Sequence, residues 1–309
     1  MEKLFTIIQV VAPIFFAVAL GMLARKKAMF QTEQIQSLQS FIVKICLPCL
    51  LFRSCLTADL GSQTLTSMVI VIPFLVLSTL WAFRHGRKYF AYHNLPMMFC
   101  CRETGMLGIP LFMILFGAEN AFYMGVLDLA QAPVAFATIG ILSAAEGEST
   151  SAGDIVKQIC RSPLIIMSLL GVALNLVGVW DLLVSIGADG AVTETLDFLS
   201  QPVSMVMLFC VGFFFSLNKE SAGPVLKVSG IEIGYFAVMA VLIQLLLGFL
   251  PNVDSLTRWS MLFYCLLPCS YLSPGLGRTE SDLTFSSGVC SLLTIICLVI
   301  FTVLTAIVA

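Results

Sequence analysis

The polar chemistry of this sequence is concentrated in CRETGMLGIPLF, residues 101–112, inside one of its most apolar stretches. Arg102 and Glu103 are adjacent there, and Thr104 follows. An arginine can bind an anion and a glutamate can carry a proton, so we expect Arg102 to meet an organic anion and Glu103 to be a proton-titratable or substrate-polar contact. The alternative is that the two charges pair with one another or with a distant partner and only seal a cavity.

Two stretches contain residues that interrupt a helix. The first break is made by Gly105, Gly108 and Pro110. The second lies in CLLPCSYLSPGLGRTE, residues 265–280, where prolines and glycines are mixed with hydroxyl side chains: Pro268, Ser270, Tyr271, Ser273, Pro274, Gly275 and Gly277. Asp128, near Gln131, is expected to reach the same region from another apolar segment. The candidate substrate-binding set comprises Arg102, Glu103, Thr104, Gly105, Gly108, Pro110, Asp128, Pro268, Ser270, Tyr271, Ser273 and Pro274.

The composition indicates that these residues lie in a membrane. Of 309 residues, 59% are hydrophobic and 11% are charged, which is typical of a polytopic membrane protein. No basic block points to nucleic acid. Because the 11 cysteines lie mostly inside apolar runs and only two histidines are present, we expect neither a metal site nor a cofactor.

A membrane-spanning helix needs about 20 mostly apolar residues. Ten segments meet this requirement: 4–24, 36–54, 65–83, 94–116, 121–143, 163–180, 194–216, 229–250, 258–277 and 285–308. With both termini outside, eleven basic residues fall in the inside loops and three in the outside segments, as the positive-inside rule requires. We therefore predict a multi-pass protein of a cell membrane, plasma or inner, with both termini outside.

Internal matches divide the ten spans into two halves. Val18-Ala19-Leu20 recurs as Val172-Ala173-Leu174, and Pro48 matches Pro202, both at an offset of 154 residues. The predicted halves are residues 1–143 and 163–309, joined by a cytoplasmic loop, 144–162. Because five spans are an odd number, the second half must be inverted relative to the first.

Breaks in corresponding spans of inverted halves are the sequence signature of a transporter's substrate site, since irregular backbone survives in a membrane only when it is shielded or lines a cavity. Half-helices starting near Ile109-Pro110 and after Pro274-Gly275 would direct their N-terminal N–H groups at an anion. Among other charged residues, Lys44 is expected to extend towards the cytoplasmic face, and Asp197 and Glu232 to lie near the membrane interface.

The segments FIVKICLPCLLF, RETGMLGIPLF and LLPCSYLSPGLGRTE resemble, in order and spacing, the auxin efflux carrier family, a relative of the bile-acid/sodium symporter fold. The resemblance implies a scaffold of spans one, two, six and seven and a mobile transport domain of spans three to five and eight to ten, in which the broken spans four and nine cross at the substrate site. It also implies elevator-like motion, dimerisation through the scaffold, and auxins or carboxylates such as malate as substrates. The family often has Asn where this chain has Glu103, and a carboxylate there would repel an anion unless it is protonated, shielded by Arg102 or used for proton coupling.

We therefore predict a secondary transporter of small organic anions, carboxylates or auxin-like acids, that works by alternating access and is not an enzyme. Its expected partners are the substrate, the lipid bilayer and a second copy in a homodimer, with protons or sodium as open choices for the coupling ion. The sequence contains no GxxxxGK[ST] loop for ATP and no HExxH or GxSxG motif. The alternative function is a ligand-binding membrane sensor with the transporter fold and no net flux.

Overall fold

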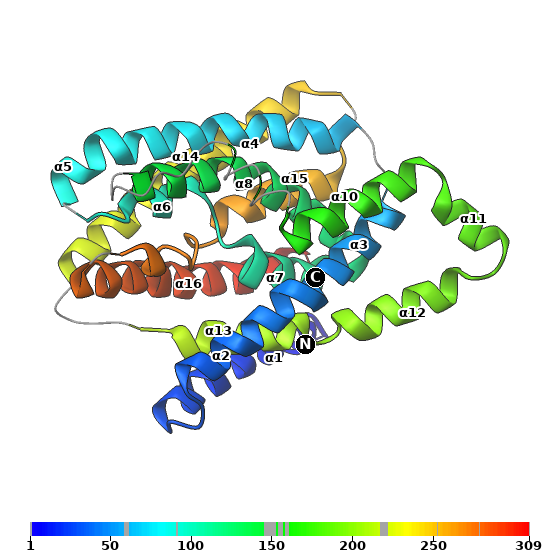
Figure 1. Ribbon diagram of the computed structural model, residues 1–309, viewed down its shortest axis with the longest axis horizontal. Coiled ribbons are helices and arrows are strands. Elements are labelled where there is room, and N and C mark those ends of the chain that lie inside the picture. Colours follow the sequence, from blue (N-terminus) through cyan, green and yellow to red (C-terminus); the bar gives the residue numbers. More distant parts are fainter. Residues whose placement is uncertain are drawn as a thin grey trace.

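The computed structural model consists of helices and their connections (Figure 1). It describes residues 2–58, 62–90, 92–144, 161–216, 222–251, 253–277 and 279–308, with Gly153 and Lys157. The predicted connecting loop, 144–162, lies almost wholly outside these described residues. Within them the structure contains no β-strand apart from one isolated bridge, so the all-α prediction is confirmed.

In the described residues up to Ala144, the chain forms eight α-helices and four shorter helical turns. Their bounds are α1 Glu2–Lys26, α2 Thr32–Phe41, η1 Ile42–Cys46, α3 Leu47–Thr57, α4 Ser62–Trp81, η2 Ala82–Gly86, α5 Arg87–Phe90, α6 Leu95–Cys100, η3 Thr104–Gly108, α7 Ile109–Phe116, η4 Ala118–Asn120 and α8 Ala121–Ala144. The turns η1, η2 and η3 are π-helical, and η4 is a 3₁₀ turn.

The second half begins after the connecting loop. Its elements are α10 Pro163–Leu176, α11 Val179–Ser185, α12 Asp189–Ser200, α13 Pro202–Phe214, α14 Ala222–Phe249, α15 Ser255–Leu266, the 3₁₀ turn η5 Pro274–Leu276 and α16 Glu280–Val308. Between α10 and α11 the chain turns through 66° at Gly178, whose φ of 77° is a left-handed conformation that glycine adopts without strain. The predicted span 163–180 is therefore bent near its end.

Five helical segments of the described chain are long and apolar enough to cross a membrane, and the bent pair α10–α11 is a sixth candidate. The five are Thr32–Thr57, Ala118–Leu142, Asp189–Phe214, Ala222–Phe249 and Glu280–Ala306. Shorter apolar helices cover Val69–His85 and Thr104–Phe116. A multi-pass membrane protein is thus confirmed, whereas the ten-span inverted repeat remains a prediction.

Two of the π turns precede a proline by the same distance. η1 ends two residues before Pro48, and η3 ends two residues before Pro110. A proline has no N–H and its ring clashes with the carbonyl of the fourth residue before it, and a wider turn relieves that clash without ending the helix. Both prolines therefore shape their helices locally rather than terminating them.

α1 packs along α13, and α3 packs along α10. Glycines permit both contacts: a Cβ at Gly21 or Gly212 would lie 2.0 Å from a carbonyl oxygen of the opposite helix, and one at Gly171 would lie 2.7 Å from the carbonyl oxygen of Phe52. Asn175 of α10 also donates to the carbonyls of Cys55, Leu56 and Ala58 at the end of α3, at 3.1, 2.8 and 2.8 Å.

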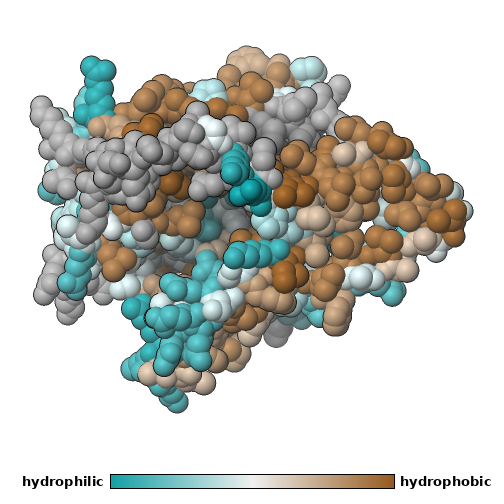
Figure 2. Space-filling view, viewed as in Figure 1, coloured by the Kyte–Doolittle hydropathy of each residue, from teal (hydrophilic) through white to brown (hydrophobic). Residues whose placement is uncertain are grey.

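A second group of helices packs around the broken segments. α4 lies against α8 and α6, α14 lies against α15 and α16, and α15 also contacts α8. Figure 1 shows α4 along the top of the view, α16 across its middle, and α13 with α1 below. Apolar side chains cover the surface formed by α10, α11 and α12 (Figure 2), including the exposed Leu176, Val177 and Phe198. This surface is suited to lipid or to another apolar protein surface.

Candidate functional site

The two predicted breaks meet inside the second group of helices. After α6 ends, Cys101 is fully extended, and Arg102 forms an antiparallel bridge with Cys269 in the non-helical stretch after α15. The N–H of Glu103 donates to the carbonyl of Pro268 at 2.9 Å. Backbone groups left free by one broken helix are thus satisfied by the other, which is the condition for irregular backbone at membrane depth.

The two breaks lead into different structures. After the first, a helix resumes directly as η3 and α7. After the second, the chain makes only the 3₁₀ turn η5 before α16 begins at Glu280. The helix expected after Pro274-Gly275 is thus α16, which begins only at Glu280, whereas the first break leads directly into a new helix N-terminus. That N-terminus is at Thr104 and not near Ile109-Pro110, because the π turn η3 precedes α7.

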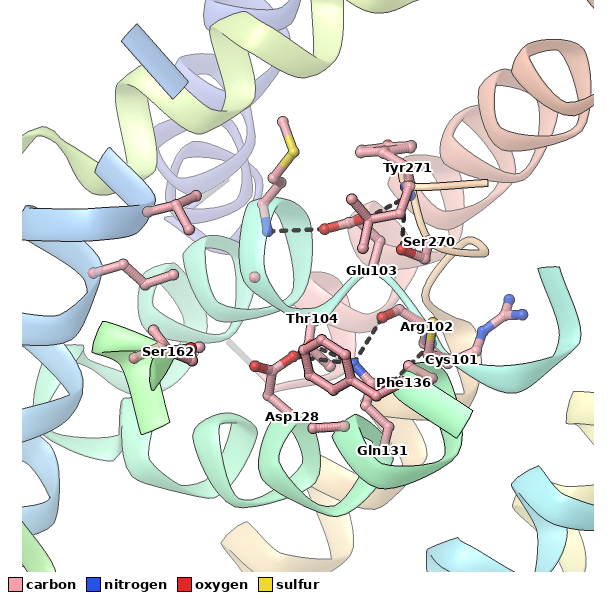
Figure 3. Close-up of a pocket in the computed structure, with 18 of the residues that line it drawn as sticks. Cys101, Arg102, Glu103, Thr104, Asp128, Gln131, Phe136, Ser162, Ser270 and Tyr271 are labelled. Carbon is pink, nitrogen blue, oxygen red and sulfur yellow. Dashed lines mark hydrogen bonds between the residues drawn. The ribbon is translucent and has the colours of Figure 1, made fainter. Parts of the chain in front are cut away.

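Arg102 and Glu103 point to opposite sides of the break. Successive side chains alternate in an extended segment, whereas in a helix they would diverge by about 100°. Figure 3 shows the Arg102 guanidinium directed away from the pocket and the Glu103 carboxylate directed towards Tyr271. The two charges therefore serve different surroundings, and they do not pair with one another.

The Arg102 guanidinium is buried among protein groups. Its Nη1 lies 2.7 Å from Oε2 of Glu232, its Nε donates to the carbonyl of Leu267 at 2.9 Å, and its Nη2 donates to the same carbonyl. The guanidinium carbon lies 3.9 Å from the centre of the Phe236 ring. Arg102 is 3% exposed and Glu232 is 0% exposed. The Glu232 carboxylate thus faces Arg102 inside the helix packing, and the guanidinium expected to meet an anion is already paired.

Glu103 caps the helix that starts at the break. Its Oε1 accepts from the N–H of Met106 at 3.2 Å, and its Oε2 accepts from the N–H of Tyr271 at 2.7 Å. A carboxylate is favoured at a helix N-terminus, where free N–H groups and the helix dipole attract negative charge. The position predicted for a substrate anion is thus occupied by the protein's own carboxylate, which also links the two breaks.

Gln131 on α8 organises the other side of the break. Its Oε1 accepts from the N–H of Arg102 at 2.8 Å and from the hydroxyl of Tyr264 at 2.7 Å. Its Nε2 donates to the Arg102 carbonyl, to Oγ1 of Thr104 and to Oδ1 of Asp128, at 3.0, 2.8 and 3.0 Å. Asp128 also accepts from the Thr104 hydroxyl. Asp128 therefore reaches the crossing as predicted, and Gln131, noted in the sequence only as its neighbour, makes five hydrogen bonds there.

These groups line a pocket of about 310 Å³. Its polar lining comprises Gln39, Arg102, Glu103, Thr104, Asp128, Gln131, Ser162, Ser270 and Tyr271, and Figure 3 shows most of them around the pocket, chiefly on the two breaks and on α8. Among the described lining residues, the only basic one is Arg102, whose charged end faces Glu232. Glu103 and Asp128 bring two carboxylates into a pocket whose other side chains are neutral or apolar.

The remaining predicted site residues divide between the pocket and its supports. Gly105 and Ser270 line the pocket, whereas Gly108 and Pro110 are buried in the helix behind it. At Gly108 a Cβ would lie 2.6 Å from Cδ1 of Leu267, so the glycine lets the two breaks approach.

Ser273 and Pro274 lie outside this pocket. Ser273 is buried, and its carbonyl accepts from Nδ2 of Asn94 at 2.8 Å. Pro274 lines a second cavity of about 450 Å³, which shares Gln39, Met106 and Tyr271 with the first. The second-break set therefore contributes mainly through Ser270 and Tyr271.

Comparisons with known proteins agree on the kind of protein. Residues 6–159 match the family described as membrane transport protein. A protein of the archaeon Methanothermobacter thermautotrophicus, strain Delta H, described as an uncharacterized transporter, is 25% identical over 254 residues, which are 78% of this chain and 79% of the relative. The family match covers the first break, and the match to the relative extends over most of the chain.

Proposed function

The chain belongs to the auxin efflux carrier family of membrane transport proteins, and we propose that it is a secondary transporter of small organic anions, carboxylates or auxin-like acids. The observation that carries this proposal is the pocket at the crossing of the two breaks, which combines backbone N–H groups with carboxyl, amide and hydroxyl side chains in an apolar setting. Such a lining fits an organic acid with a polar head and an apolar body.

The charges of the pocket favour uptake of the acid together with a proton. Two carboxylates, Glu103 and Asp128, already lie there, and adding a substrate carboxylate would raise the repulsion in a medium of low dielectric constant. Protonation of Glu103 would weaken its bonds to the N–H groups of Met106 and Tyr271. The substrate carboxylate would then take the helix N-terminus that Glu103 leaves.

The transport step is proposed as an elevator-like movement of one helix group against the other. The packing of α1 on α13 and of α3 on α10 supports a fixed scaffold, and the helices around the crossing would form the moving part. The pocket is lined from both groups, since Gln39, Val43 and Leu47 come from the scaffold side. The inverted halves, 1–143 and 163–309, the homodimer and the outside position of both termini belong to the same proposal.

Counterflow in proteoliposomes tests this function. Vesicles preloaded with malonate, malate or indole-3-acetate should accumulate the labelled form of at least one of them, and more strongly at acidic than at neutral pH. Glu103→Gln removes the titratable group and should flatten this pH dependence, and Glu119→Gln, an exposed carboxyl outside the pocket, is the matched control.

If labelled acids stabilise the protein against heat but no counterflow occurs with any of them, the transport proposal is refuted in favour of the sensor. If counterflow occurs and Glu103→Gln keeps the wild-type pH dependence, the acid is transported without a proton on Glu103.

A further inference from the structure

The Arg102 guanidinium and Glu232 form an ion pair on the side of the break away from the pocket, and the sequence offered for it only the alternative of a distant partner that seals a cavity. Its two charges come from segments 130 residues apart and meet at 2.7 Å. Both side chains are almost fully buried, at 3% and 0% exposure. Buried ion pairs contribute little net stability, because removing two charges from water costs about as much as their attraction returns. The presence of this buried pair therefore needs an explanation other than a contribution to stability.

The contacts of Arg102 join three parts of the helix group around the crossing. Its backbone belongs to the first break and is bridged to Cys269 in the second. Its guanidinium donates through two nitrogens to the carbonyl of Leu267, the first residue after α15. The same guanidinium pairs with Glu232 and lies over the ring of Phe236, both on α14. One side chain therefore ties both breaks to a 28-residue helix.

This tie also determines which way Glu103 faces. The two neighbouring side chains leave the break on opposite sides (Figure 3). While the guanidinium is held on α14, the Glu103 carboxylate is directed to the N–H groups of Met106 and Tyr271. Releasing the guanidinium would let the segment rotate and would remove Glu103 from the pocket.

We infer that Arg102 and Glu232 are a positioning pair, which holds the two breaks and α14 as one rigid unit and presents Glu103 to the substrate. This inference rests on the proposed function for its biological meaning, but its geometry can be tested without a substrate. It assigns Arg102 a role behind the pocket instead of a contact with the transported anion.

Hydrogen–deuterium exchange of the purified protein in detergent tests the pair directly. Arg102→Met, Glu232→Met and the double variant replace the charges by apolar side chains. Each single variant should speed exchange about tenfold or more in peptides covering 101–108 and 267–273, because an unpaired buried charge opens its surroundings. The double variant should exchange no faster than either single one, and peptides of α1 and α13 should match the wild type.

The matched control is Arg53→Met, which breaks the ion pair of Arg53 with Asp197. This pair has the same 2.7 Å distance, but 17% of the Arg53 side chain and 45% of the Asp197 side chain are exposed. It should leave both break peptides unchanged. Wild-type exchange at the breaks in both single variants, or effects that add in the double variant, would overturn the inference.

Counterflow measurements then distinguish a positioning role of Arg102 from a substrate-binding role. The labelled acid is the one among malonate, malate and indole-3-acetate that the wild-type protein exchanges. A positioning pair predicts that Arg102→Met and Glu232→Met lower the maximal rate by the same factor and change the half-saturating concentration by less than about twofold. A rise in that concentration confined to Arg102→Met would make Arg102 a substrate ligand and refute the inference. If none of the acids is exchanged, the proposed function fails while the exchange experiment still decides the geometry.

Discussion

Replacing Gly212 by alanine should force α1 and α13 apart. A Cβ at Gly212 would lie 2.0 Å from the carbonyl oxygen of Val18, and ordinary contact begins at 3.4 Å. The obstacle is backbone on both helices, so no side-chain rotation can relieve it. The two helices must therefore separate by more than 1 Å at this point.

The expected cost follows from overpacking in a tight helix contact. Inserted methyl groups that force backbone shifts cost typically about 1–3 kcal/mol, and a Cβ that meets the backbone of the facing helix belongs at the upper end of that range. Separation also weakens dispersion contacts along the rest of the interface. We expect Gly212→Ala to lower the free energy of unfolding by about 3 kcal/mol.

The measurement is the fraction of detergent-solubilised protein that stays monodisperse after heating to a series of temperatures. Gly230→Ala on α14 is the control, because that position is exposed and nothing lies within 4 Å of its Cβ. The midpoint should fall clearly for Gly212→Ala and stay near the wild type for Gly230→Ala.

A combined variant sharpens the test. At Gly21, on the facing side of the same contact, a Cβ would lie 2.0 Å from the carbonyl oxygen of Phe209. Once one alanine has separated the helices, the second meets less resistance, so the double variant should cost less than the sum of the single ones. Equal midpoints for Gly212→Ala and Gly230→Ala would refute the close contact and with it this account of the scaffold.

Two further predictions concern polar contacts. Asn175→Leu removes the donor that three carbonyls at the end of α3 share. It should lower the free energy of unfolding by about 1–3 kcal/mol, measured in the same heating assay. An unchanged melting midpoint would show that water replaces this donor. Gln131→Leu should abolish counterflow, because it removes the hydrogen bonds of Gln131 to Thr104 and Asp128 beside the first break. The control variant Gln244→Leu loses one hydrogen bond to the Arg258 carbonyl, outside the pocket, and should keep counterflow. Equal counterflow in the two variants would contradict the role given to Gln131.

The membrane character, the two breaks and the family resemblance can all be predicted from the amino-acid sequence alone. Composition decides the first, because so many apolar residues cannot be buried inside a soluble domain of this size. Local composition decides the second, because glycines and prolines cluster at residues 105–110 and again at 268–277, whereas a single proline such as Pro133 stays inside a helix. The place of Asp128 beside the crossing also followed from the sequence, since it lies on a span expected next to the first break.

The division of the polar residues between the pocket and its supports follows from the packing of segments that are far apart in the sequence. Whether Arg102 faces the pocket depends on the extended conformation of the break and on partners far along the chain, Glu232 at a separation of 130 residues and Leu267 at 165. The same holds for Glu103, whose carboxylate takes the helix N-terminus only because Tyr271 is brought beside Met106. Spacing along a sequence reports neighbours within an element, whereas pairing between elements depends on packing that local pattern does not encode.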